Sequence, residues 1–198
     1  ADLGLAMAVG WWFRDRPWAG LAAMAAMLLW PVTWYVSAWW GQYESIYVLP
    51  AVLALLAARA KRPSLVAALL AISLMTKPQA LPFIVPFAAW FLATQGVRGT
   101  IKGALVAIVV AVLLWLPFIP ANGPLNYLAN VREYQDGVFS VLSLRAWNPW
   151  WIVQVLGGGG EFIADGTAVI GPITFRHIGF GLAGLLALVV FVGVYRRP

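Results

Sequence analysis

The sequence predicts an all-α fold, a polytopic transmembrane helical bundle with about seven spans and an external loop that contains interfacial or re-entrant helices. Of the 198 residues, 63% are hydrophobic and only 10% are charged, whereas charged residues make up about a quarter of a soluble globular domain. Several apolar runs also approach or exceed the roughly 17 to 25 residues that a helix needs to cross a hydrocarbon core. Short clusters of cations separate these runs.

The expected spans alternate with short polar connections. The first ends at the charged turn Arg14 to Pro17, and the second contains Pro31. We expect a single transmembrane domain, the C-terminal part of a longer membrane protein, because the chain starts directly in an apolar run without an initiator Met or a basic leader. In chain order the spans cover residues 1–13, 18–38, 46–58, 64–76, 79–94, 103–119 and 177–195, with an external segment at 120–175, all within the domain 1–198.

The segment 64–94 is long enough to cross the membrane once or twice. Two crossings place the cations of all the short connections on one side, in agreement with the positive-inside rule. A single crossing divides these cations between the two sides and buries Lys77 near mid-membrane, at a cost of about 2.5 to 3.5 kcal/mol. We therefore expect two crossings. The cations concerned are Arg14, Arg16, Arg59, Lys61, Arg62, Arg98, Lys102, Arg196 and Arg197.

The net charge of +6 does not indicate nucleic-acid binding, because the cations sit between apolar runs and do not form one accessible face. The expected partner of this surface is the lipid bilayer. The sequence has no cysteine, which excludes disulfides and thiolate metal sites. His177 stands alone beside Arg176 at a helix start, so we interpret it as structural, with no second metal ligand at a credible spacing.

With this predicted topology, three polar motifs lie on the same side of the membrane. They are WWGQYES at 39–45, TKPQ at 76–79 and LRAWNPWW at 144–151. The face is the non-cytoplasmic one, because the basic connections lie on the other side. Tryptophans and tyrosines accompany the motifs, either as an interfacial belt or as stacking faces for a sugar ring or an isoprenoid tail. The polar chemistry is thus expected on one side of the membrane.

The first motif offers a carboxylate beside a close backbone approach. Gly41 permits that approach, and Gln42 supplies an amide. Glu44 can accept a proton or bind sugar hydroxyls. The alternative for Glu44 is a structural charge that complements the N-terminal dipole of the following helix.

The other two motifs offer cations. Lys77 stands between two short, proline-bounded helices and needs an anionic partner, since ionisable residues at membrane depth are usually functional. Its alternative is snorkelling to the interface. Gln79 would support whatever Lys77 binds, and Arg145 would pair with a phosphate through two hydrogen bonds.

The external segment 120–175 is expected to hold two kinds of helix. A cap at Asn122 followed by Pro124 starts a helix whose apolar residues share one face, which indicates a helix in the interface. The stretch 138–156 is apolar but interrupted by polar residues, so a re-entrant segment fits it better than a full span.

The motifs resemble those of a known family in their order and spacing. The run WWGQYES, a basic turn, TKPQALP about 32 residues later and VLSLRAWNPWW in the next external loop resemble polytopic membrane glycosyltransferases of the GT-C superfamily. The closest likeness is to bacterial mannosyltransferase-like members with a WGQxD motif. Glu44 stands where that motif more often has Asp. The resemblance covers most of the chain.

The resemblance implies an inverting hexosyltransferase in the bacterial plasma membrane. It would move a mannose-like hexose from a polyprenyl-phosphate donor to a glycan or lipid acceptor on the non-cytoplasmic face. The family's main catalytic acid is expected upstream of residue 1, so the fragment alone would be inactive, with Asp2 as a supporting acid. No cofactor is predicted, and a divalent metal is left open. The implied roles are catalysis for Glu44, donor phosphate binding for Lys77 and Arg145, and substrate binding for Trp40, Gly41, Gln42, Gln79 and Asn148.

Two other functions fit the same polar groups. A transporter or flippase for a lipid-linked or anionic solute would place charged residues at mid-depth in several helices. The spans carry almost none, which favours a one-sided site. A scaffold subunit whose polar face docks a partner enzyme is the third possibility.

Overall fold

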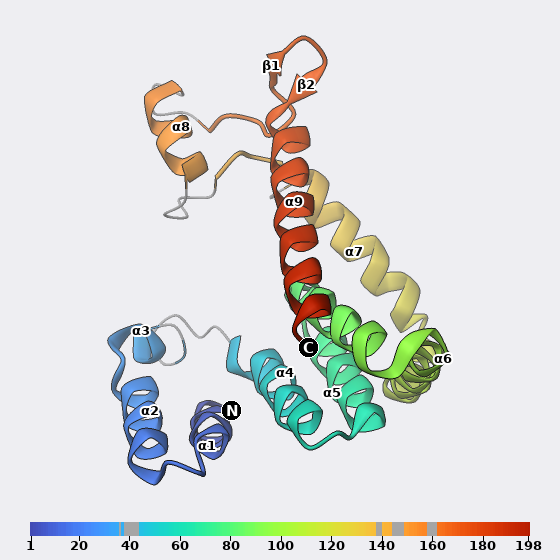
Figure 1. Cartoon of the computed structure of the whole chain (residues 1–198). Helices are drawn as coiled ribbons and strands as arrows, with labels where there is room; N and C mark the ends of the chain where they lie inside the picture. Colours follow the sequence, from blue (N-terminus) through green and yellow to red (C-terminus); the bar gives the residue numbers. More distant parts are fainter. Residues whose placement is uncertain (36, 38–43, 138–139, 144–148, 158–161) are drawn as a thin grey trace. The chain divides into compact units, whose positions relative to one another are not determined.

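The computed structural model describes residues 1–35, 37, 44–137, 140–143, 149–157 and 162–198, with side chains omitted at 134–137. The chain is almost entirely helical in these ranges (Figure 1). It forms two units, Ala1–Leu114 with Val190–Pro198 and Trp115–Val189, and each is described by itself. The all-α prediction is confirmed.

The first unit begins with a helical hairpin. Helix α1 (Asp2–Trp12) turns into α2 (Pro17–Leu29), and the short α3 (Pro31–Trp34) follows. The expectation of one span over 18–38 is wrong, because the helix is interrupted at Trp30. That residue is extended, with φ −64° and ψ 119°. The residue before a proline is driven out of the helical region, and Pro31 then begins a new helix.

Close backbone contact joins α1 to α2. A Cβ added to Gly20 would lie 2.9 Å from the Gly10 carbonyl oxygen, so only glycine permits this approach. Small residues at helix crossings are the usual means of close packing in membrane helices. Helix α1 also packs on α4 (Glu44–Arg59), where Gly4 faces Leu49.

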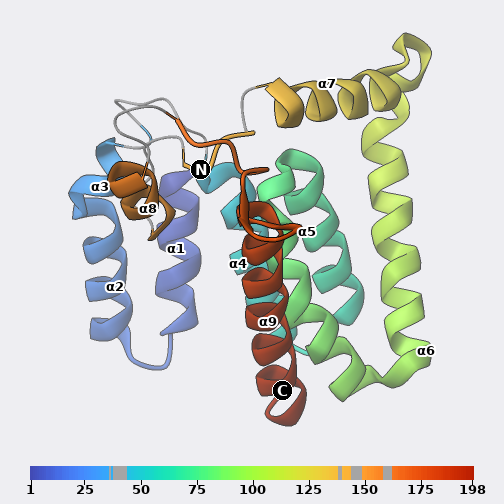
Figure 2. The ribbon, with the colours of Figure 1, turned by 90° about the horizontal axis from the view of Figure 1, so that it is seen from above.

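The core of the first unit forms where α4, α5 (Pro63–Thr76) and α6 (Leu81–Trp115) meet. Helices α4 and α5 are antiparallel neighbours joined by three residues (Figure 2). Alanines let their backbones approach, and two phenylalanines from α6 fill the remaining space. The buried cluster is Ala54, Ala57, Val66, Ala67, Leu70, Phe87 and Phe91.

Helix α6 consists of two arms. A short 3₁₀ turn, η2 (Pro78–Ala80), leads into the first arm, and the chain breaks at Gly96, where φ is 64° and ψ is −176°. The second arm returns along the first, since a Cβ on Gly103 would lie 2.9 Å from the Phe91 ring. A loop carrying Arg98 and Lys102 was expected here. That expectation is wrong, because the helix resumes directly after one glycine.

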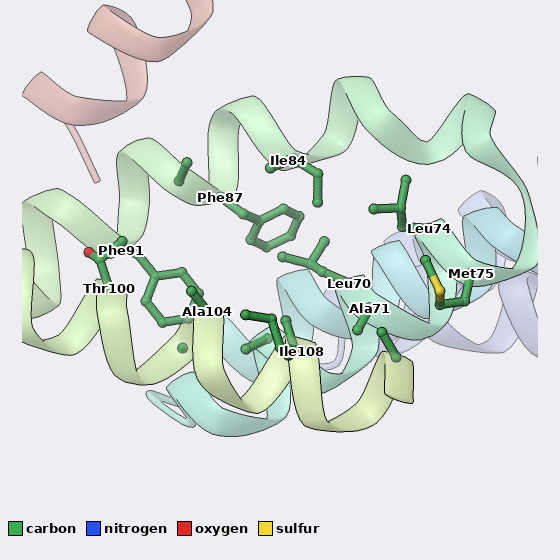
Figure 3. Close-up of a pocket in the computed structure, with 15 residues that line it drawn as sticks. Leu70, Ala71, Leu74, Met75, Ile84, Phe87, Phe91, Thr100, Ala104 and Ile108 are labelled. Atoms are coloured by element: carbon green, nitrogen blue, oxygen red, sulfur yellow. The ribbon is translucent and has the colours of Figure 1, made fainter. Parts of the chain in front are cut away.

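An apolar cavity of about 300 Å³ lies between α5 and the two arms of α6. Figure 3 shows Phe87 and Phe91 reaching into it from the first arm, opposite Ile108 of the second. Leu70 and Leu74 line it from α5. The second arm exposes further apolar residues on its outer side, with Leu105 at 57%. Exposed apolar surface of this kind is typical of contact with lipid or a partner.

Basic turns gather at one end of the first unit. Arg59, the last residue of α4, donates hydrogen bonds to the Trp12 carbonyl and to Asp15 in the α1–α2 turn. A cavity of about 720 Å³ at this end is lined by Trp12, Arg59, Lys61 and, from the first arm of α6, Gln95. The α1–α2 and α4–α5 connections therefore lie at the same end of the first unit as the last residues of the first arm of α6.

The second unit is built from shorter elements. A 3₁₀ turn, η3 (Leu116–Ala121), ends at Asn122 with φ 52°, and α7 (Gly123–Gly137) follows it. Helix α8 (Pro149–Gly157) precedes a two-stranded antiparallel hairpin, β1 (Ala168–Ile170) and β2 (Ile173–Thr174), which was not predicted. Helix α9 (Phe175–Arg196) starts directly after it. His177 accepts a hydrogen bond from the Thr174 amide at Nδ1, so it caps this start.

Two described helical segments are long and apolar enough to cross a membrane, Pro78–Ala121 and Phe175–Arg196. The expected count of about seven spans is not supported. The other apolar helices are short: α2 has 13 residues and α5 has 14, against the roughly 20 needed for a hydrocarbon core. The break at Trp30 divides an apolar run that was expected to form one span.

Candidate functional site

Lys77 lies at the C-terminal end of α5, outside the helix. Its backbone is extended, with φ −155° and ψ 128°, because the following Pro78 disfavours the helical region. Its amide still donates to the Ser73 carbonyl, and its own carbonyl accepts from Ala80. The residue is therefore held on both sides by backbone hydrogen bonds. The break predicted at this lysine and proline is present.

Glu44 is the first residue of α4. The N-terminal end of a helix carries partial positive charge, which favours a carboxylate there, and the C-terminal end favours a cation. Because α4 and α5 are antiparallel neighbours, the start of α4 lies near the end of α5. Both helix dipoles thus favour the charge that stands at this end.

The two side chains form an ion pair. Lys77 Nζ donates to Glu44 Oε1 at 2.6 Å. The side chains are 27% and 37% exposed, respectively, so the pair is partly withdrawn from solvent and less screened than a surface pair. The two motifs that sequence analysis assigned to one face are in direct contact. The anionic partner that Lys77 was expected to need is Glu44.

Tyr47 lies beneath this pair, one turn into α4. Lys77 Nζ is 5.6 Å from the centroid of the Tyr47 ring, within the range of a cation–π contact. The ring also stacks on Phe83 of α6, with centroids 6.2 Å apart. Ser73 Oγ donates to the Tyr47 carbonyl at 2.6 Å. Tyr47 thus connects α4, α5 and α6 at the site.

The carboxyl group of Glu44 is ionised over a wider pH range than usual. Burial raises its pKa, but hydrogen bonds with Lys77 and Tyr47 and the positive charge of Lys77 outweigh burial. The pKa therefore lies below its ordinary value. A carboxylate with a lowered pKa is a weaker base, so this site is better suited to holding a hydroxyl than to removing its proton.

A third cavity adjoins Glu44 on the side of α1. It measures about 310 Å³ and is lined by Asp2, Ser37, Glu44 and Ser45 among others. Ser37 Oγ donates to Asp2 Oδ1 at 3.2 Å. Asp2, expected as a supporting acid, therefore shares a cavity with Glu44. Among the described residues no group of three or more acids or histidines is arranged to hold a metal ion.

Of the other six predicted site residues, the structure describes only Gln79. Gln79 lies in η2, exposed, two residues after Lys77. The five others, Trp40, Gly41, Gln42, Arg145 and Asn148, lie outside the described residues, and their assignment to the site stays a prediction.

Sequence reasoning missed Tyr47 as a member of the site. It was one of the tyrosines expected to form either an interfacial belt or stacking faces for a sugar ring or an isoprenoid tail. The signal that distinguishes it is its spacing, because Tyr47 follows Glu44 by three residues and so shares its helix face.

Comparisons of the chain with protein-family models, with curated proteins and with solved structures find no match.

Proposed function

We propose that this chain is part of a membrane hexosyltransferase that moves a mannose-like hexose from a polyprenyl-phosphate donor to a glycan or lipid acceptor. The observation that carries the proposal is the Lys77–Glu44 contact of 2.6 Å. It joins the WWGQYES motif to the TKPQ motif at one end of an antiparallel helix pair. Transfer from a lipid phosphate requires a cation for the leaving group and a carboxylate for the acceptor in one place, and this pair supplies both.

Lys77 is assigned to the donor. In an inverting transfer the acceptor oxygen attacks the anomeric carbon, and the bond from that carbon to the phosphate oxygen breaks. The electron pair and the negative charge then remain on the phosphate. An ammonium group stabilises that charge as it develops, which is the most effective form of catalysis for such a step. The phosphate would bind to Lys77 in place of the Glu44 carboxylate or beside it.

Glu44 is assigned to the acceptor hydroxyl. Its lowered pKa makes it a hydrogen-bond acceptor that orients the hydroxyl. The proton that the hydroxyl loses would go to a carboxylate other than Glu44. Gln42 and Gln79 would bind sugar hydroxyls, and Arg145 would add a second cation for the phosphate.

The site is proposed to face the non-cytoplasmic side of a multi-pass arrangement. Helix α4 has 16 residues, which corresponds to about 24 Å at 1.5 Å per residue. The Lys77–Glu44 ion pair therefore lies at the N-terminal end of α4, and the basic turn at Arg59 lies at its C-terminal end. Cations in connections favour the cytoplasmic side. No charged residue lies within α4 or α5 between these ends, which supports a one-sided site over a transport path.

The test is a transfer assay in membranes that contain the full-length protein, with polyprenyl-phosphate-linked hexoses as donors. Lys77→Ala is expected to lower kcat/KM for the donor by about 10²- to 10³-fold, the usual effect of removing one charge-stabilising donor. Lys77→Arg should retain part of the activity. Lys102→Ala removes an exposed cation elsewhere and should leave transfer unchanged.

Glu44→Gln and Glu44→Asp separate the roles of the carboxylate. A positioning role predicts a partial loss in both variants, and a general base predicts a far greater loss in Glu44→Gln than in Glu44→Asp. Full activity in Lys77→Ala, or no transfer from any polyprenyl-phosphate hexose by the unmodified protein, would overturn the proposal. Membrane insertion of each variant is checked alongside.

A further inference from the structure

The cavity beside Glu44 has a mixed lining that the proposed chemistry at Lys77 does not use. It is an open cavity lined by the start of α1, the α2–α3 region and the first turns of α4, and its volume is about 310 Å³. That volume is at the lower end of the roughly 300 to 1,000 Å³ typical of ligand pockets. The cavity is therefore suited to a single small ring rather than an extended chain.

One part of the wall consists of hydrogen-bond acceptors. Asp2 is half-buried and accepts a hydrogen bond from Ser37, and Glu44 is shared between this cavity and Lys77. Ionised carboxylates only accept hydrogen bonds. A ligand for this wall must therefore offer several donor hydrogens, and a ligand with its own negative charge would be repelled.

The rest of the lining is mainly apolar. It consists of Leu5, Met27, Val32 and Val48, with the hydroxyl-bearing residues Thr33 and Ser45 beside them. A metal ion would need oxygen ligands on most sides, which this wall does not offer. A pyranose ring has hydroxyl groups at its edge and C–H groups on its faces, so it matches a cavity that is polar on one side and apolar on the other.

We propose that this cavity binds the acceptor, specifically an uncharged, hydroxyl-rich sugar ring held by Asp2 and Glu44. The inference rests on the proposed function and adds the place and the chemical class of the acceptor. Glu44 then stands between the two substrates, with the donor phosphate on the Lys77 side and the acceptor hydroxyl on the Asp2 side. Inversion requires the attacking oxygen and the leaving phosphate to lie on opposite faces of the anomeric carbon, and a donor hexose placed between the acceptor and Lys77 would meet this requirement.

The experiment compares KM values for acceptor and donor in membranes that contain the full-length protein. Asp2→Asn keeps the shape of the side chain and removes its charge. We expect it to raise the acceptor KM by about tenfold, corresponding to the loss of one charge-assisted hydrogen bond, with the donor KM unchanged. Val48→Phe fills the cavity from α4 and leaves both carboxylates in the sequence, and we expect the same split. Asp15→Asn, at the opposite end of α1, is the matched control and should change neither constant.

Direct binding distinguishes this inference from the proposed function. A methyl hexopyranoside is titrated against the purified protein, and binding to the unmodified protein that Val48→Phe abolishes supports the cavity even where no transfer is found. Transfer by the unmodified protein with an unchanged acceptor KM in both Asp2→Asn and Val48→Phe overturns the cavity and leaves the proposed function standing. Absence of both transfer and binding overturns both. Stronger binding of the corresponding uronic acid than of the neutral sugar also counts against the assignment.

Discussion

Besides the Arg59–Asp15 contact, ion pairs between distant residues fix two further places in the described part of the chain. Glu44 and Lys77 are 33 residues apart in the sequence, and Asp165 and Arg176 are 11 apart. The second pair is bidentate: Arg176 Nε and Nη2 donate to the two carboxylate oxygens of Asp165, each at 2.7 Å. Such planar pairs are the most specific charge-assisted hydrogen bonds available to a protein. Here the pair ties the loop before β1 to the start of α9.

Asp165 gives this tie a defined pH dependence. Hydrogen bonding from Arg176 outweighs burial and lowers the pKa of the Asp165 carboxyl below its ordinary value of 3.8. Since the pKa is lower in the folded state, the pair stabilises the loop at pH values above about 4, and this contribution is lost as pH falls through the folded pKa. Protection of the Arg176 amide, which donates to the Asp165 carbonyl, should fall with it.

Hydrogen exchange of that amide is the measurement. Asp165→Asn is expected to speed exchange by about tenfold near neutral pH, as for the loss of one partly exposed charged pair. The difference from the unmodified protein should shrink below pH 4. Glu133→Gln, an exposed carboxyl change on α7, should have no effect on this amide. A difference for Asp165→Asn that is constant from pH 7 to pH 3 would contradict the explanation.

At the scale of residues, the sequence predicts where a side chain lies relative to a helix end better than it predicts which residue that side chain contacts. Lys77 was expected to need an anion, and Pro78 correctly indicated a helix end there. That the anion is Glu44 follows from the packing of α4 on α5, which depends on alanines such as Ala54 and Ala67. The role of Tyr47 was missed because it too depends on contacts between helices. Its stacking on Phe83 comes from a helix 36 residues further along the chain, and no spacing rule reaches that far.

Helix α6 depends on one glycine for its shape. The Gly96 conformation, φ 64° and ψ −176°, belongs to a region that is essentially accessible to glycine alone. No heavy atom lies within 4 Å of the place where a Cβ would stand. The restriction therefore comes from the backbone itself and not from crowding.

Gly96→Ala tests this dependence. We expect it to destabilise the protein by about 1 to 3 kcal/mol, the range for a non-glycine residue in a strained conformation. Gly179→Ala in α9 is the control, since it also has open space but ordinary helical geometry. It should be neutral or slightly stabilising. Thermal unfolding in detergent measures both, and equal midpoints for the two variants would contradict the assignment.

At the scale of elements, the sequence predicts most helix positions and fewer of their ends. The expected spans 64–76 and 177–195 correspond to α5 and α9 within two residues at each end.

A single span over 18–38 was wrong, because the helix is interrupted before Pro31. The loop expected around Arg98 failed because charge was taken as a sign of a turn. Only a residue without a Cβ can make the break that occurs at Gly96. The β1–β2 hairpin is too short to produce a periodic pattern.

At the scale of the whole molecule, the arrangement of charged ends predicts a sidedness. The basic turn around Arg59 and the pair at Lys77 lie at opposite ends of α4 and α5. Because the chain has no cysteine, single cysteines can be introduced without removing others. We expect a membrane-impermeant maleimide to label Gln79→Cys from the non-cytoplasmic side and Arg62→Cys from the cytoplasmic side. Both positions are exposed, so labelling of both from one side would contradict the topology.

The number of spans is the least predictable property of the whole molecule. Composition and run length indicated a helical membrane protein, and two described helices are long and apolar enough to cross a bilayer. Apolar composition does not distinguish a full crossing from a short helix packed on its neighbours. The 14 residues of α5 show the difference, because its apolar run ends where a proline ends the helix.

The contact between Lys77 and Glu44 bears on the biogenesis of the protein. As the chain leaves the ribosome, α4 emerges first with an acidic group at its leading end. Its counter-charge follows only once α5 has been made. In the proposed membrane arrangement, each helix alone would bring an uncompensated charge to the membrane interface, whereas the hairpin of the two carries none at that end. We therefore expect the translocation machinery to release α4 and α5 into the bilayer together, as one preassembled hairpin.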